Sequence, residues 1–200
     1  MARCGWWRRL EGRDPCLYSK RRENVTLPTM FDRSSRRRLN QHTARLFEGE
    51  TLFARFARTV CEASCLPRKE LFEAWEVAKR VRRHLRGAPI VELCAGHGLL
   101  SYALLLLDPS AEQATCVDVR RPKSFDRLGV TLVERWPQLS GRVHYIEDDL
   151  AAVEIPAHAT VVSVHACGVL SDRVIDRALA AHARVAVMPC CHALAVSDDG

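Results

Sequence analysis

Residues 90–98, IVELCAGHG, place a carboxylate next to a glycine turn in this 200-residue chain. Glu92 lies four residues before Gly96, and Gly98 follows two residues later. Glycine at such a turn permits a positive φ and lets a ligand approach the backbone closely. Free N–H groups at the start of the following helix can meet polar or negative groups. The segment therefore predicts a small-molecule site where a strand turns into a helix.

Acidic residues also end the next two expected strands. Asp118 ends TCVD about twenty residues past the turn, where a carboxylate can accept hydrogen bonds from both hydroxyls of a ribose. Asp148 and Asp149, in HYIEDDL, end the third strand, within reach of an adenine amino group. Because ligands of open parallel sheets bind beyond the carboxyl ends of the strands, these acids predict a nucleoside pocket.

Two adenosine cofactors compete for this pocket. GHGLLS, residues 96–101, is a near match to the dinucleotide fingerprint, with Ser101 in place of the third glycine, and favours a nicotinamide-dependent oxidoreductase. Glu92, however, lies so close before the turn that it would repel a pyrophosphate. It suits a ligand with an ammonium and a sulfonium, which is S-adenosylmethionine (SAM). We expect SAM and keep the oxidoreductase as an alternative.

Histidines and cysteines gather at the ends of two later strands, VVSVHACGVLSD and VAVMPCCHAL. The candidate residues there are His165, Cys167, Asp172, Cys190, Cys191 and His192. Methyl transfer from a sulfonium needs an oriented nucleophile and often a base that takes its proton. We expect His165 to be that base, Asp172 to orient it or contact the substrate, and Cys190 and His192 to line the substrate side.

Zinc is an alternative use for these side chains. Successive residues of a strand point to opposite faces, so Cys190 and His192 share a face that Cys191 does not. Neither stretch has the C-x₂₋₄-C spacing of a structural zinc site, and we expect no metal. Cys94, Cys116 and Cys191 are expected to be small buried side chains. The nine cysteines show no regular framework, which predicts reduced thiols in a cytosolic compartment.

Alternating strands and helices would position these residues. The pattern predicts strands at 89–94, 114–119, 143–147, 160–165 and 184–189, and helices at 98–107, 124–137 and 171–182. Strands rich in Val, Ile and Ala, separated by helices, are typical of a sheet covered on both faces. The fold class expected is α/β, with a Rossmann-like, mostly parallel sheet and crossover helices.

A basic helical segment precedes this sheet. We expect a helix at 40–62, whose early part Gly49 interrupts, and another at 68–86, bounded by Pro67 and Gly87. The chain then divides into a basic, poorly ordered segment at 1–38, a helical part at 39–87 and the cofactor-binding domain at 88–200. Residues 1–89 hold 21 Lys and Arg against 10 Asp and Glu, a net charge of +11, whereas residues 90–200 carry −5. The basic half predicts a polyanionic partner, although a solvated basic surface is an equal alternative. No apolar run is long enough to span a bilayer, so no membrane partner is expected.

At this point the chain resembles a known family. VELCAGHG resembles motif I of the class I SAM-dependent methyltransferases, E/D-x-G-x-G-x-G, with Cys94 in place of the first glycine. Asp118 matches the family's ribose acid and Asp149 its adenine-side acid. The H-x-C-G, S-D and C-C-H stretches are similar to one branch of the family, which includes the tRNA acceptor-stem 2′-O-methyltransferases and the methyltransferase domain of glutathione-transferase C-terminal-domain-containing proteins. The resemblance covers about 68–195.

The resemblance implies a cytoplasmic enzyme that transfers a methyl group from SAM to a nucleophile on RNA, either tRNA or rRNA. It also implies a set of cofactor-binding residues, namely Glu92, Cys94, Ala95, Gly96, Gly98, Asp118, Asp148 and Asp149. The family's sheet usually has seven strands, whereas this sequence ends soon after the fifth, so either the sequence is cut short or the last hairpin is missing. A non-catalytic RNA-binding or assembly protein that keeps the fold is the alternative from another class.

Overall fold

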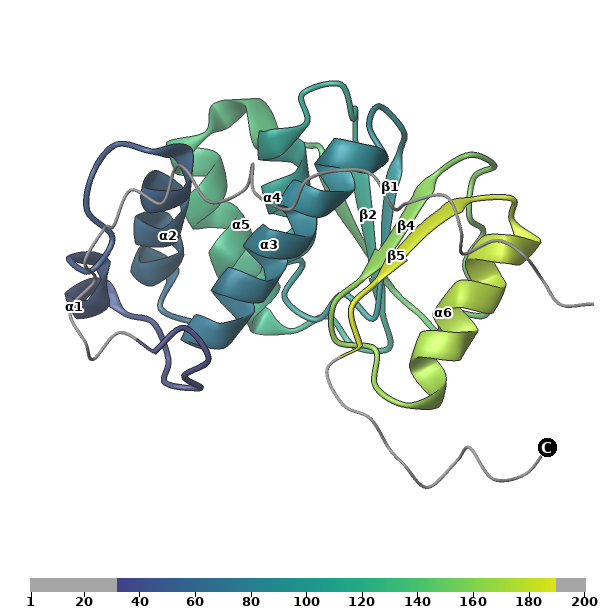
Figure 1. Ribbon diagram of the computed structural model, residues 1–200, viewed down its shortest axis with the longest axis horizontal. Coiled ribbons are helices and arrows are strands. Elements are labelled where there is room, and N and C mark those ends of the chain that lie inside the picture. Colours follow the sequence, from purple (N-terminus) through teal and green to yellow (C-terminus); the bar gives the residue numbers. More distant parts are fainter. Residues whose placement is uncertain (1–31, 190–200) are drawn as a thin grey trace, which may run out of the picture. The chain divides into compact units, whose positions relative to one another are not determined.

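Five parallel strands form the centre of the protein, whose structure is a computed structural model that describes residues 32–189 (Figure 1). The strands are β1 (Ile90–Leu93), β2 (Ala114–Asp118), β3 (Val143–Glu147), β4 (Thr160–Ser163) and β5 (Arg184–Val187). Their order in the sheet is β3-β2-β1-β4-β5, and every neighbouring pair is parallel. The predicted fold class is confirmed, and the chain reverses its direction across the sheet between β1 and β4, where such sheets bind ligands.

Helices cover both faces of this sheet. Because crossovers between parallel strands are right-handed, α4 (Leu99–Leu107) and α5 (Lys123–Arg135) lie on one face. The chain moves the other way from β4 to β5, so α6 (Val169–Ala180) lies on the opposite face (Figure 1). Buried residues from the sheet and α6 form a common core there, with Val91 and Leu93 of β1 packed near Val174 of α6. Alternation along β1 then turns Glu92 toward α4.

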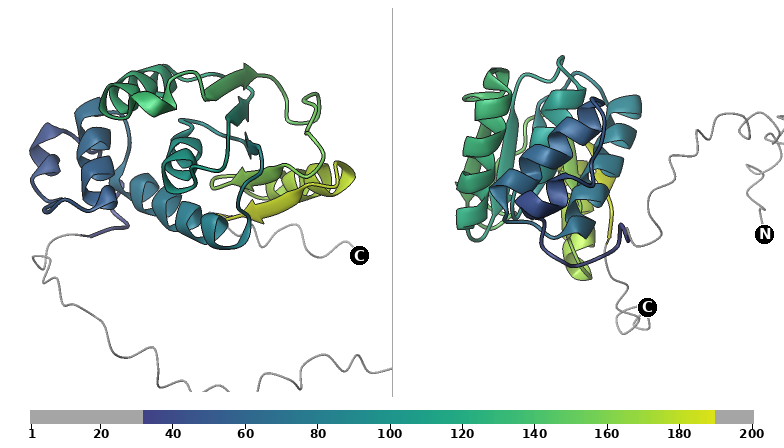
Figure 2. Two further views of the ribbon diagram at one scale, coloured as in Figure 1. Left: turned by 90° about the horizontal axis from the view of Figure 1, so that it is seen from above. Right: turned by 90° about the vertical axis from the view of Figure 1, so that its left-hand side faces the viewer.

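The expected helix at 68–86 is α3 (Arg68–His84), and it packs against α4 over the same face of the sheet (Figure 2). Its first two amides are capped from outside the helix, because Arg68 N–H donates to the Arg37 carbonyl and Lys69 N–H to the Ser35 carbonyl. Residues 35–38, expected to be poorly ordered, are therefore bonded to the start of α3. This placement brings the N-terminal turn of α3 to the carboxyl end of the sheet.

The range predicted as helical at 40–62 holds two helices, divided at the turn that contains the interrupting Gly49. These are α1 (Gln41–Ala44) and α2 (Leu52–Ala63), separated by a turn in which Gly49 has a φ of +82°. Thr51 caps α2 by accepting a hydrogen bond from Ala54 N–H at 3.1 Å. Arg58 holds the turn, because its Nη1 donates to the carbonyls of Phe47 and Gly49, each at 2.7 Å. Within the described residues, no helix combines the length and apolar character that a membrane span requires.

Candidate active site

The glycine turn lies between β1 and α4, as predicted, and its backbone explains why two glycines are needed there. Gly96 has a φ of +49° and Gly98 a φ of +67°. A Cβ on Gly98 would lie 3.0 Å from Cys116 Sγ and 3.0 Å from the Phe125 ring, whereas a Cβ on Gly96 would meet no heavy atom within 4 Å. Gly98 is therefore required for packing of the turn on β2 and α5, while Gly96 faces open space that a ligand can use.

Cys94 begins the turn in an unusual conformation for a residue with a side chain. Its φ is +54°, in the left-handed region, at the place where the resembling motif has its first glycine. The side chain is only partly buried, so the expectation of a fully buried Cys94 is wrong, although Cys116 is buried as expected. Cys61 and Cys65 are also free thiols.

Glu92 is a buried carboxylate held by α4. Its side chain turns away from the α6 core, and Oε2 accepts hydrogen bonds from Ser101 N–H at 2.9 Å and from the Ser101 hydroxyl at 2.6 Å. The residue is 4% exposed. Burial raises the pKa of Glu92 to about 7, against the opposing effect of the two Ser101 donors. A cation placed beside this carboxylate would favour its charged form, so the position suits a positively charged ligand group.

Asp118 and Asp149 lie around Cys94, on the other side of the turn. Asp118 Oδ2 accepts a hydrogen bond from Gly96 N–H at 2.9 Å, so this carboxylate fixes the turn. Asp149 Oδ1 accepts from Ala151 N–H at 2.8 Å and from Arg173 Nη2 at 2.9 Å. Both carboxylates oppose ionisation of the Cys94 thiol, whose pKa is raised first by burial and then by these charges. Asp148 Oδ1 accepts a hydrogen bond from Asp149 N–H at 2.7 Å, within the loop that follows β3.

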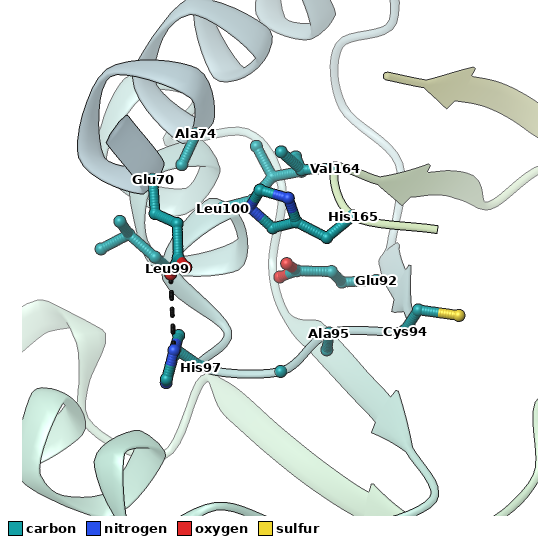
Figure 3. Close-up of a pocket in the computed structure, with 11 residues that line it drawn as sticks. Glu70, Ala74, Glu92, Cys94, Ala95, His97, Leu99, Leu100, Val164 and His165 are labelled. Carbon is teal, nitrogen blue, oxygen red and sulfur yellow. Dashed lines mark ion pairs between the residues drawn. The ribbon is translucent and has the colours of Figure 1, made fainter. Parts of the chain in front are cut away.

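A cavity of about 230 Å³ opens between the glycine turn, α3 and the end of β4 (Figure 3). The predicted residues that line it are Glu92, Cys94, Ala95, Gly96 and His165. Glu70 and Ala74 of α3 also line it, and the sequence analysis did not single them out. Little in the sequence indicated a role for Glu70, because an acidic residue in the first turn of a helix is common.

Two histidines approach acidic residues of α3 at the edge of this cavity. His97 Nε2 lies 3.4 Å from Glu70 Oε2, the pair marked by the dashed line in Figure 3, and its Nδ1 lies 2.5 Å from Ser124 Oγ. His165 Nε2 lies 3.9 Å from Glu73 Oε2. Burial lowers the pKa of both histidines, and it raises the pKa of Glu70 together with the neighbouring charge of Glu73. Neutral imidazoles beside carboxylates can accept a proton.

The carboxylate that meets His165 therefore comes from α3. Asp172, the residue expected to orient His165, is exposed in the first turn of α6, and the structure gives it no bond to that histidine. Cys190 and His192, together with Cys191, lie outside the described residues, so their expected places in the site stay predictions. Within residues 32–189, no three His, Cys, Asp or Glu side chains are grouped in a way that could hold a metal ion.

Comparison with solved structures finds matches at low identity. A Pyrococcus horikoshii protein described as a candidate RNA methyltransferase is 20% identical, with a TM-score of 0.46 and 62% of each chain covered. The mitomycin 7-O-methyltransferase MmcR is 20% identical (TM-score 0.45), with 74% of this chain and 42% of that chain covered. The ribosomal protein L11 methylase of Lactobacillus delbrueckii subsp. bulgaricus is 15% identical (TM-score 0.42), with 57% and 56% covered. This chain thus spans less than two thirds of the first of these proteins.

No curated protein matches the sequence. The sequence model of one family, described as a methyltransferase domain, matches residues 70–197. That match covers more than half of the chain and includes the glycine turn, the strand-end acids and His165. The chain therefore belongs to this methyltransferase domain family.

Proposed function

We propose that this protein transfers the methyl group of SAM to a nucleophile of RNA, either tRNA or rRNA, with His165 as the base. The observation that carries the proposal is that Glu92, the glycine turn and His165 line the same cavity. A site for the donor and a proton acceptor on one cavity is what methyl transfer from a sulfonium requires. A cytoplasmic location is the expectation that accompanies such a substrate.

The residues of the cavity fit the cofactor. Glu92 supplies a buried carboxylate for a cationic group, and Gly96 leaves open space at the turn. Asp118 and Asp149 do not line the cavity itself, but their charges act on Cys94, which does, and from there they would hold the nucleoside end. When bound, SAM supplies an electrophilic methyl group on a sulfonium. The protein orients the acceptor toward that group, and His165 accepts the proton that the acceptor loses.

The support for RNA is an exposed basic surface beside the cavity, formed by Arg36, Arg37 and Arg38. Two backbone hydrogen bonds tie this segment to the first turn of α3, which also carries Glu70 of the cavity. Arg38 is close enough to contribute to the lowered pKa of His97, after burial and the charge of His165. Arginine side chains at this place can bind phosphates while a base or ribose enters the cavity.

The test of activity is incubation of the full chain with labelled SAM and total RNA. Asp118→Ala removes the acceptor of Gly96 N–H and should abolish transfer, whereas Asp176→Ala, an exposed change on α6, should leave it unchanged. SAM binding without transfer to any RNA would instead support a non-catalytic assembly protein. Stabilisation by a nicotinamide cofactor and not by SAM in thermal-shift competition would support an oxidoreductase.

The test of the RNA surface is the salt dependence of binding. Replacing Arg37 and Arg38 by Gln should weaken RNA binding and reduce the slope of log K against log salt by roughly 1–2, because about 0.7–0.9 counterions are released per phosphate contact. Arg82 and Arg83, also exposed, lie about 18 Å along α3 from Glu70 at 1.5 Å per residue. The same double change there is the matched control. Equal slopes for both double variants would contradict the proposal that RNA binds at Arg37 and Arg38.

A further inference from the structure

Glu73 of α3 has a buried carboxylate oxygen that has no role in the proposed function so far. Its Oε1 lies 3.3 Å from Lys69 Nζ, whereas Oε2 is buried and has no hydrogen-bond partner among the described residues. The side chain is 22% exposed. A buried carboxylate oxygen left without a donor is costly, and native proteins keep few of them. Such an oxygen at the edge of a cavity points to a donor that arrives during function.

The nearest titratable group to this oxygen is the His165 imidazole. The distance from Glu73 Oε2 to His165 Nε2 is 3.9 Å, which is longer than a hydrogen bond but short enough to become one after a small rotation of either side chain. Hydrogen bonds of catalytic groups are often long before the substrate binds and shorten in the reactive complex. Glu73 belongs to α3. The His165 ring lines the cavity (Figure 3).

The charges around His165 come from two elements. Glu73 and Lys69 of α3 act in opposite directions, since Glu73 raises the pKa of His165 and Lys69 lowers it. Burial is the largest influence and keeps that pKa below its ordinary value. His97 of the glycine turn also interacts with His165, and Glu70 pairs with His97. At neutral pH the His165 ring is therefore uncharged, with one nitrogen protonated and one free.

We infer that Glu73 is a positioning residue that binds the Nε2–H of His165 and leaves Nδ1 free to accept a proton from the methyl acceptor. The inference rests on the proposed function. The acceptor's lone pair forms the new bond to the methyl carbon, the carbon–sulfur bond breaks with its electrons remaining on sulfur, and the acceptor's proton moves to Nδ1. The Glu73 carboxylate then stabilises the imidazolium that results.

The experiment compares Glu73→Gln and Glu73→Ala with Glu76→Gln, which alters an exposed ion pair of the same helix with Lys79. The first readout is NMR of the ¹⁵N-labelled cofactor-free chain, with the His165 signals assigned from their loss in His165→Gln. Both Glu73 variants should lower the pKa of His165, because the carboxylate that raises it is gone. Glu73→Ala should also abolish the preference for the Nε2–H tautomer, and Glu76→Gln should change neither property.

The second readout is methyl transfer as a function of pH. Glu73→Gln should lower kcat by about 10- to 100-fold with little change in SAM affinity, and should move the rising limb of the pH profile to lower pH. Glu73→Asp should recover part of the rate. An unchanged His165 pKa and tautomer in both variants would overturn the pairing, and an unchanged kcat would overturn its role in transfer. If the wild-type chain methylates no RNA, the proposed function fails separately, and the NMR measurement still decides the pairing.

Discussion

Replacing Gly98 by Ala tests the packing of the glycine turn directly. An added Cβ would lie 3.0 Å from Cys116 Sγ and from two carbons of the Phe125 ring, and both of these side chains are buried. Neither neighbour is a flexible chain end, so the strand or the helix must shift. A left-handed φ for alanine costs about 1–2 kcal/mol, and overpacking of a buried site costs about 1–3 kcal/mol. The expected loss in the free energy of unfolding is therefore about 2–5 kcal/mol.

Gly96→Ala is the matched control, because its φ of +49° imposes the backbone strain while no heavy atom lies within 4 Å of the added Cβ. It should cost only about 1–2 kcal/mol. Urea denaturation of the cofactor-free chain measures the free energy of unfolding of both variants. The slope m should equal that of the wild type, which shows that the unfolded state is unchanged. SAM titration should show the opposite order, with Gly96→Ala losing more affinity because its Cβ occupies ligand space. Equal losses of stability in the two variants would refute the packing argument.

Two further predictions concern the buried carboxyl of Glu92. Its pKa of about 7 lies above the ordinary value of 4.5, so its contribution to stability is complete below about pH 4.5 and is lost as the pH rises through 7. The difference corresponds to about 3 kcal/mol, and urea denaturation across this range should show a loss of that order that Glu92→Gln removes. Ser101→Ala removes the 2.6 Å donor to Glu92, and at pH 8 it should cost about 1.5–3 kcal/mol in the wild type but only about 0.5–1.5 kcal/mol beside Glu92→Gln. Additive losses in that double-mutant cycle would show that the hydroxyl does not stabilise the charged carboxylate.

Local patterns were sufficient to predict the sheet and the glycine turn. Apolar runs separated by helices predicted all five strands, and Glu92 and Asp118 could be placed near the turn because the carboxyl ends of parallel strands share an edge. Gly49 was visible in the sequence as an interruption of the helical pattern, but not as a turn that separates two helices. Arg58 stabilises that turn from the following helix by bonding two of its carbonyls, and a contact of this kind leaves no periodic signal.

The partner of His165 shows a second limit of sequence reasoning. Asp172 was expected to orient the histidine or contact the substrate, because the stretch that carries both residues ends a strand at the predicted site. In the folded chain the carboxylate that approaches the His165 ring, at 3.9 Å, is that of Glu73, from a helix that precedes the first strand and packs on α4. In the sequence, Glu73 has the same character as Glu76, which is half-exposed and pairs with Lys79 on the surface. Polar residues of an amphipathic helix thus acquire different roles from tertiary contacts that their spacing does not encode.

Charges of opposite sign lie on either side of the first turn of α3. The cavity and its edge hold the carboxyls of Glu70, Glu73 and Glu92 beside imidazoles whose pKa values are lowered, so this space favours a cation. Arg37 and Arg38, a short distance along the chain from α3, present the opposite charge to solvent. Phosphates would be repelled by the carboxyls and held outside, so a polyanion can contribute only its uncharged base or ribose to the cavity. Opposed charges on either side of the first turn of α3 would therefore direct the reaction to the uncharged part of the substrate.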